Sequence, residues 1–261
     1  MADRLQFNFS QTFPGAIWST LVVPQQNLLI LEVRDEDKRE VRFSAFDYLQ
    51  NSFRWKDLLL EEPWWIGLTA VSENILLLHL YQNTENPDEK SLMAFDILKQ
   101  KVLWHLKDFA FSYLEGNAVV GMQSKPEILA RTLDLRTGEV IPDSHNKNPL
   151  SGNISAIKPF QYVEGHAYFD TVKSFLAIKL NIEPVSSVEY VEYNSLIFIS
   201  YYVKEEGLVN YLVVFDETGT LVAKEKLGDQ LKGIGFETFF ILAGCLIFVR
   251  NRGELVSYRI V

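Results

Sequence analysis

Short apolar runs separated by turn residues recur along the whole chain. In one series, each run ends in an apolar residue followed by Asp or by a basic substitute. Its six members lie at 43–47, 91–96, 130–134, 174–179, 213–216 and 256–259. The five intervals from Asp47 to Arg259 average about 42 residues, which is the length of a four-stranded propeller blade.

A second series of runs falls between the members of the first. These runs are rich in β-branched or aromatic residues, and most follow Asn or Gly, as expected for a tight hairpin that enters a buried strand. The six runs lie at 27–31, 74–78, 117–120, 166–169, 194–198 and 245–248. Two series with the same count predict six small antiparallel sheets.

The Asp residues at the ends of the first series have a local role. After a strand, an Asp carboxylate can accept backbone amide protons two residues further on and so fix the turn. Gly138 follows Asp134, and Gly219 follows Asp216, where each Gly would supply the positive φ of a hairpin with a bulge.

Two tryptophans stand eight residues after such an Asp, Trp55 after Asp47 and Trp104 after Asp96. We expect their large rings to wedge between neighbouring sheets and to serve the structure. The copies with a Thr-Gly turn, Thr137-Gly138 and Thr218-Gly219, lack the Trp, and the copies with Trp55 and Trp104 lack the Gly. The full pattern therefore appears only as a composite of several copies.

This composite resembles the repeat of quinoprotein-type β-propellers, which carry an apolar-Asp-x-x-Thr-Gly-x-x-apolar-Trp pattern between the third and fourth strands. The chain as a whole also resembles an uncharacterised bacterial family with propeller-like repeats. Both resemblances imply a β-propeller, and neither implies an activity. Quinone-dependent dehydrogenases resemble the chain only in the repeat and often carry adjacent cysteines that this chain lacks, so we expect no cofactor.

The sequence therefore predicts one all-β domain over residues 1–261, a β-propeller of six blades. The last repeat reaches Val261 after its third strand, and the alternating segment 5–9 could supply the fourth strand from the amino terminus and remove exposed edges. Alternatively, Ser10 and Trp18 keep the eight-residue spacing, and the amino-terminal segment would then be half of a further blade.

The fourth blade is expected to be irregular. Only 15 residues separate Lys179 from Asn194, against 21 between Asp96 and Asn117, and Pro184 lies within the shorter interval. The outer strand of this blade would be absent, short or irregular. The segment 142–152, just before the blade, is the longest stretch without expected structure.

Charge and hydropathy narrow the class of partner. The chain has 25 Lys and Arg against 34 Asp and Glu, a net charge of −9, which argues against binding nucleic acid. The apolar runs fall well short of the roughly 18 residues of a membrane span, and residues 1–20 lack the features of a secretory signal. We therefore expect a cytoplasmic protein, in which the single cysteine stays reduced. We also expect a monomer.

Motifs for catalysis are absent from the sequence. Gly233 and Gly235 lack the third glycine of a dinucleotide fingerprint, and no Gly-x-Ser-x-Gly elbow occurs. Cys245 precedes an apolar run and is expected to be a small buried residue. The four histidines are isolated from one another, so we expect neither a metal site nor a catalytic residue; they are His79, His105, His145 and His166.

The loops that follow the second strand of each repeat carry acidic clusters, at 35–37, 85–89 and 205–206. By topology these loops share a face with the connections between sheets, one of which contains Glu61, Glu62, Trp64 and Trp65. Adjacent aromatic rings with carboxylates could bind a protein or a small ligand. The simpler interpretation is that the charges are solvated and that one Trp points into the core.

Two functions remain open. The first is a noncatalytic protein that binds an unknown protein or small ligand through Trp64, Trp65, Glu61 and Glu62. The alternative is a hydrolase or lyase with carboxylates, and a divalent cation if one is used, at the mouth of a central channel, because different blades can supply an acid and a base without a linear motif.

Overall fold

The computed structural model describes residues 4–83, 85–142 and 156–261. Strands joined by tight turns make up most of it. The chain divides into two compact units, one formed by residues 18–153 and the other by residues 1–17 together with 154–261. The prediction of a single domain over residues 1–261 stays a prediction.

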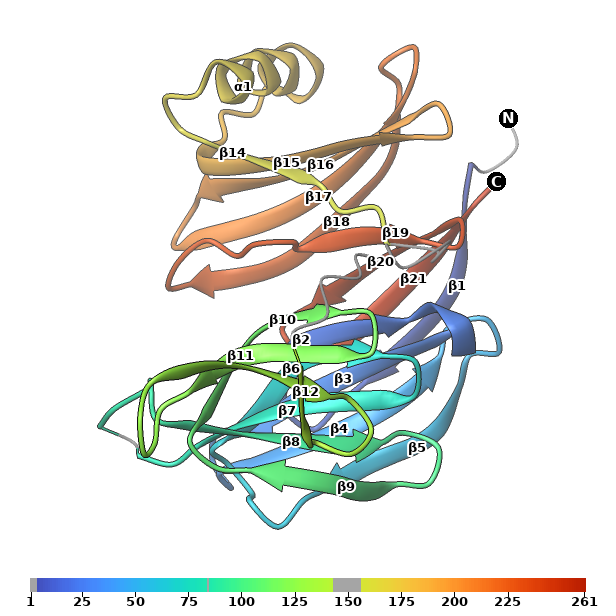
Figure 1. The fold of residues 1–261 in the computed structure, drawn as a ribbon. Coiled ribbons are helices and arrows are strands. Elements are labelled where there is room, and N and C mark those ends of the chain that lie inside the picture. The colour runs from blue at the N-terminus through green and yellow to red at the C-terminus, as the bar shows by residue number, and fades with distance from the viewer. Residues whose placement is uncertain (1–3, 84, 143–155) are drawn as a thin grey trace. The chain divides into compact units, whose positions relative to one another are not determined.

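The unit of residues 18–153 contains three four-stranded antiparallel sheets (Figure 1). In each sheet the strands follow one another in chain order. The first sheet consists of β2 (Ala16–Val23), β3 (Leu28–Asp35), β4 (Glu40–Asp47) and β5 (Ser52–Leu59). The second consists of β6 (Ile66–Ser72), β7 (Ile75–Tyr81), β8 (Lys90–Asp96) and β9 (Lys101–Leu106). The third consists of β10 (Phe109–Glu115), β11 (Ala118–Gln123), β12 (Leu129–Asp134) and β13 (Val140–Ile141).

The other unit contains two sheets and a helix. A five-stranded sheet is formed by β14 (Phe160–Val163), β15 (Val185–Tyr193), β16 (Leu196–Lys204), β17 (Leu208–Asp216) and β18 (Leu221–Leu231). The helix α1 (Ala167–Leu180) lies between β14 and β15 in the chain and packs beside both (Figure 1). The last sheet has the order β1-β21-β20-β19, formed by β1 (Leu5–Thr12), β19 (Phe239–Leu242), β20 (Cys245–Arg250) and β21 (Glu254–Ile260).

The predicted closure of the last sheet by the amino-terminal strand is confirmed. β1 pairs antiparallel with β21, from Leu5 opposite Ile260 to Thr12 opposite Glu254. The next strand, β2, belongs to the first sheet, so the amino-terminal segment divides between two sheets. Trp18 lies on β2, where 60% of its side chain is exposed.

The prediction of an all-β protein built from small antiparallel sheets is confirmed, but the described residues form five sheets. The strands predicted at 166–169 and 174–179 are wrong, because both segments lie at the start of or within α1. The interval between Lys179 and Asn194, where an absent, short or irregular outer strand is expected, instead holds the nine-residue strand β15. The segment 142–152 lies, from residue 143 onward, outside the described residues.

The local sequence explains why residues 167–180 form helix α1. Phe169, Val172 and Leu176 are buried at spacings of three and four, which is the period of a helix face. His166 caps the amino terminus, where its side chain accepts a hydrogen bond from the Tyr168 amide. Asn181 ends the helix with φ of 54°, in the left-handed region that suits a C-terminal cap.

The core lies between neighbouring sheets and follows the two-residue period of a strand. On β7, Leu76 and Leu78 pack toward the first sheet, whereas Ile75 and Leu77 pack toward the third. The five-stranded sheet is covered differently, because β19–β21 pack on one face and α1 on the other. Helix α1 therefore covers one face of the five-stranded sheet, whereas neighbouring sheets cover the faces of β7.

The predicted Asp turns are present in four sheets. In each, Oδ1 of the Asp accepts the amide of the residue two positions on; the four residues are Asp47, Asp96, Asp134 and Asp216. Gly138 and Gly219 have φ of 72° and 76°, as predicted. Within the described part of the chain, no helix has the length and apolar character needed to cross a membrane.

Candidate functional site

The predicted binding residues lie in the segment 60–65, which connects β5 to β6. Backbone hydrogen bonds fix this segment on both sides. The Val41 amide donates to the Pro63 carbonyl at 2.6 Å, and the Tyr81 amide donates to the Trp65 carbonyl at 2.9 Å. The segment is therefore held between β4 of the first sheet and the end of β7 of the second sheet.

The two adjacent tryptophans differ in exposure. Trp64 is half-buried and packs against the core between the first two sheets. Trp65 is 42% exposed, and the edge of its ring meets Tyr81 with 6.4 Å between centroids. One indole thus anchors the loop, while the other presents an apolar surface to solvent.

The two glutamates also differ. One oxygen of Glu62, Oε1, accepts the amides of Trp64 at 3.0 Å and Trp65 at 2.8 Å. Glu62 therefore fixes the turn that carries both tryptophans. Glu61 is exposed. The structure brings all four predicted residues into one ordered loop, and it gives Glu62 a structural role.

A residue that the sequence reasoning missed lies at the centre of this site. The Arg34 guanidinium is 5.3 Å from the centre of the Trp64 ring and 5.5 Å from that of Trp18. Both distances are within the range of cation–π attraction. The guanidinium also donates to the carbonyl of Trp64 at 3.2 Å and to that of Ile66 at 2.7 Å.

A buried carboxylate completes the arrangement around Arg34. Glu32 is 2% exposed, and its Oε1 accepts from Arg34 Nε at 2.7 Å. Its Oε2 accepts from the Leu68 amide at 2.8 Å, across to the next sheet. A buried carboxylate requires such partners, because removing it from water without them costs several kcal/mol. Glu32 therefore holds Arg34 in place and joins two sheets.

The site continues onto β6 and β7. The His79 ring meets Tyr81 edge-on at 5.1 Å, and its Nδ1 lies 2.9 Å from Thr69 Oγ1. Burial, with smaller contributions from the charges of Lys90 and Arg34, lowers the pKa of His79 to about 4. The imidazole is therefore neutral at physiological pH. We call Trp18, Arg34, Trp64, Trp65 and Tyr81 the aromatic–arginine cluster.

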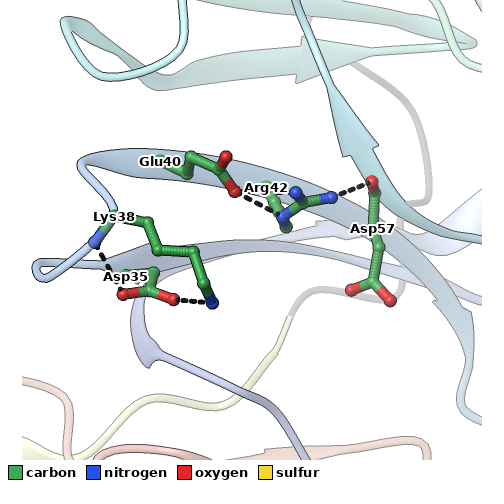
Figure 2. Close-up of polar contacts among 5 residues, drawn as sticks. All are labelled: Asp35, Lys38, Glu40, Arg42 and Asp57. Carbon is green, nitrogen blue, oxygen red and sulfur yellow. Dashed lines mark hydrogen bonds and ion pairs between the residues drawn. The ribbon is translucent and has the colours of Figure 1, made fainter.

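The acidic hairpin beside this cluster is balanced by its own cations (Figure 2). Asp35 pairs with Lys38 Nζ at 2.6 Å, and hydrogen bonds from Lys38 hold the pKa of Asp35 below its usual value. Arg42 pairs with Glu40 at 2.7 Å and also donates to the Asp57 carbonyl. The carboxylates of Asp35 and Glu40 are therefore paired within the hairpin and are less available to a cationic partner.

The remaining candidate groups are dispersed. Among the described residues, no group of three or more His, Cys, Asp and Glu side chains could hold a metal ion. His145 lies outside the described residues. Cys245 is buried at 6% exposure, as predicted, and burial raises the pKa of its thiol. The hydrolase or lyase alternative stays a prediction.

One signal in the sequence could have revealed Arg34. The run Leu28–Leu31 is wholly buried, and Glu32 and Arg34 continue the same strand at alternating positions. Two opposite charges at i and i+2 share one face of a strand. Two opposite charges that extend a buried run are therefore expected to form an ion pair and to be surrounded by other protein groups.

These sheets place the chain among all-β proteins made of small antiparallel sheets. A family model described as "Domain of unknown function (DUF4905)" matches residues 22–104, which include Arg34 and the segment 60–65. No curated protein matches the chain in sequence.

Three of the solved structures that are similar to the chain each share 10% sequence identity with it. BamB from Moraxella catarrhalis matches with a TM-score of 0.39 over 98% of this chain and 99% of its own. A member of the DUF4221 family from Bacteroides vulgatus matches with 0.35 over 98% and 97%. The β-propeller domain of the Trilobed protease from Pyrococcus furiosus, described as having an open velcro topology, matches with 0.37 over 93% and 79%.

Proposed function

We propose that this protein is a noncatalytic binding protein whose aromatic–arginine cluster contacts a partner protein. The observation that carries the proposal is the position of Arg34 between the rings of Trp18 and Trp64. Trp, Tyr and Arg are the residues that most often dominate the binding energy of protein interfaces.

The cluster has two further properties of a binding surface. Trp18 and Trp65 are 60% and 42% exposed, so burying their indoles against a partner would be favourable. Arg34 is held by Glu32 and by two backbone carbonyls, so little side-chain entropy is lost when a partner binds. A partner that offers a carboxylate or an aromatic ring would suit this surface.

We also propose that the sheets are blades arranged about an axis in a β-propeller, as the repeats predict. A contact that recurs between successive sheets supports this arrangement. The Trp55 indole donates to Ile97 of the second sheet, and the Trp104 indole donates to Leu135 just after β12 of the third, both at 3.0 Å. The same contact repeated from sheet to sheet generates a rotation. We further propose that the protein is monomeric and cytoplasmic, as expected from its sequence.

The test compares capture of partners from a lysate of the native host by the wild type and two variants, Trp18→Ala and Trp65→Ala. Both side chains are exposed, so the variants should fold, and thermal unfolding checks this. Tyr113→Ala, which removes a 53% exposed aromatic ring elsewhere in the same unit, is the matched control. We expect a protein captured by the wild type and Tyr113→Ala to be lost from both Trp variants. Equal capture by all four proteins would refute the proposal.

A further inference from the structure

A cavity of about 370 Å³ lies between helix α1 and the five-stranded sheet. This volume falls in the lower part of the range for small-molecule sites. Thr171, Val172 and Phe175 line it from the helix, and Ile197 and Ile199 line it from β16. These residues make a largely apolar container with walls on two sides.

Tyrosines line the rest of the cavity. Tyr162 comes from β14, Tyr168 from the first turn of α1, and Tyr190 from β15. The rings of Tyr162 and Tyr168 lie 5.1 Å apart, and His166 stacks on both. With Phe175, four aromatic rings from three elements surround one space. Aromatic rings gathered around one space are the kind of lining that binds organic cations.

The charge of the lining has one sign. Glu192 is its charged residue, and the nine described residues around the cavity include no Lys, Arg or His. Tyr190 and Glu192 stand at i and i+2 on β15, and the Tyr190 hydroxyl donates to Glu192 Oε1. Burial and this carboxylate raise the pKa of Tyr190, so the phenol keeps its proton.

The helix terminus does not reverse this balance. The amino terminus of α1 carries a partial positive charge along its axis, and Asp170 in its first turn offsets that charge. The cavity lies along the flank of the helix, where Thr171 and Phe175 point. Both the carboxylate and the electron-rich aromatic rings of the lining therefore favour a cation.

We propose that this cavity binds a small organic cation, an alkylated or quaternary ammonium compound, with its charge among the tyrosines and near Glu192. The site lies in the unit that does not contain the aromatic–arginine cluster. It is independent of the proposed protein-binding function.

The experiment is titration calorimetry on the full chain with choline and benzyltrimethylammonium. The neutral isostere of choline, 3,3-dimethyl-1-butanol, separates recognition of charge from burial of apolar surface. We expect both cations to bind and choline to bind at least about tenfold more tightly than the neutral isostere. Absence of binding by both cations at millimolar concentration, or equal binding of the neutral isostere, overturns the proposal.

Two matched variants locate the site. Glu192→Gln removes the carboxylate charge with little change in size, and we expect it to weaken choline binding at least about fivefold. Glu217→Gln makes the same change at an exposed turn between β17 and β18 and should leave binding unchanged. Equal affinities of the two variants would overturn the assignment. Trp65→Ala should have no effect on choline, so failure here is distinguishable from failure of the proposed protein interface.

Discussion

The indole N–H of Trp55 donates to the carbonyl of Ile97 at 3.0 Å, and this hydrogen bond joins the first sheet to the second. Trp55 is buried at 8% exposure and meets the ring of Phe95 edge-on at 6.3 Å. Trp104 repeats the relationship with Leu135. Ile97 and Leu135 each directly follow the Asp of an Asp turn. Each turn therefore joins two strands of its own sheet and also supplies a carbonyl that accepts the indole N–H from the preceding sheet.

We expect Trp55→Phe to lower the free energy of unfolding by about 1–3 kcal/mol. The substitution keeps an aromatic ring but leaves the Ile97 carbonyl without the indole donor in a buried environment. It also removes part of the ring from the core. Urea denaturation followed by circular dichroism measures the change.

Trp65→Phe is the control, because Trp65 is exposed and its indole N–H contributes no contact between sheets. Its effect should stay within about 0.5 kcal/mol. If the two substitutions cost the same, the Trp55 hydrogen bond does not stabilise the contact between the first two sheets.

The Asp turns and their tryptophans could be predicted from the sequence because they depend on local chemistry and fixed spacing. Asp47 and its equivalents bond to amides two residues away, so the relevant partners are already neighbours in the chain. The pairing of β1 with β21 was also predictable, because an incomplete last sheet leaves an edge that a distant alternating segment can cover.

The sixth sheet could not be excluded from the sequence. The runs at 166–169 and 174–179 are short and apolar, and periodicity over so few residues does not separate a strand from a helix. The full segment carries the helical spacing of Phe169, Val172 and Leu176. Both elements satisfy the same need, because the face of the five-stranded sheet must be covered by apolar side chains.

Two glycines with similar backbone angles provide a test of packing at the turns. Gly138 has φ of 72°, and a Cβ there would lie 2.7 Å from the Trp104 ring. Gly116 has φ of 58°, and a Cβ there would meet nothing within 4 Å. We expect Gly116→Ala to cost about 1 kcal/mol for the left-handed conformation alone. Gly138→Ala should cost about 1–3 kcal/mol more, because the ring must move.

Thermal and chemical unfolding of both variants checks this comparison. Equal losses of stability would show that Trp104 does not pack on the turn. A change in tryptophan fluorescence in Gly138→Ala, absent in Gly116→Ala, would support the contact.

The lowered pKa of His79 predicts a dependence of stability on pH. Between its ordinary value of 6.5 and about 4, the unfolded chain binds a proton that the folded protein does not. Stability is therefore fully present above about pH 6.5 and decreases as the pH falls toward 4. The contribution amounts to no more than about 3 kcal/mol over this window, because His79 is partly exposed.

Urea denaturation near pH 7 and near pH 5 measures this dependence in the wild type and in His79→Gln. We expect the variant to lose less stability than the wild type between the two conditions. The lowered pKa of His105 acts equally in both proteins, so the difference isolates His79. Parallel losses would contradict the assignment.

The candidate site was predictable in its loop but not in its centre. Adjacent tryptophans and glutamates stand out in a sequence, and topology places their loop beside the hairpins. Arg34 acts through Glu32, two carbonyls and two rings that belong to β2, β3, the segment 60–65 and β6. Only tertiary structure brings these groups together, although the charged pair at the end of a buried run is a usable signal.

The pair of Arg34 and Glu32 should be far more important for stability than the pair of Arg42 and Glu40. The two pairs have the same sequence separation and the same distance of 2.7 Å. They differ in burial, since Glu32 is 2% exposed, whereas Glu40 is 25% exposed. Removing one partner of a buried pair leaves an uncompensated charge and costs about 3–5 kcal/mol, whereas an exposed pair contributes about 1 kcal/mol or less.

We therefore expect Arg34→Met to lower the free energy of unfolding by about 3–5 kcal/mol and Arg42→Met by no more than about 1 kcal/mol. Adding Glu32→Gln to Arg34→Met removes the unpaired charge while keeping an acceptor for the Leu68 amide, and should recover at least about 1 kcal/mol. Urea denaturation of the four proteins provides the values. Equal losses for the two Arg variants, or no recovery in the double variant, would show that burial of Glu32 does not make Arg34 the central residue of this site.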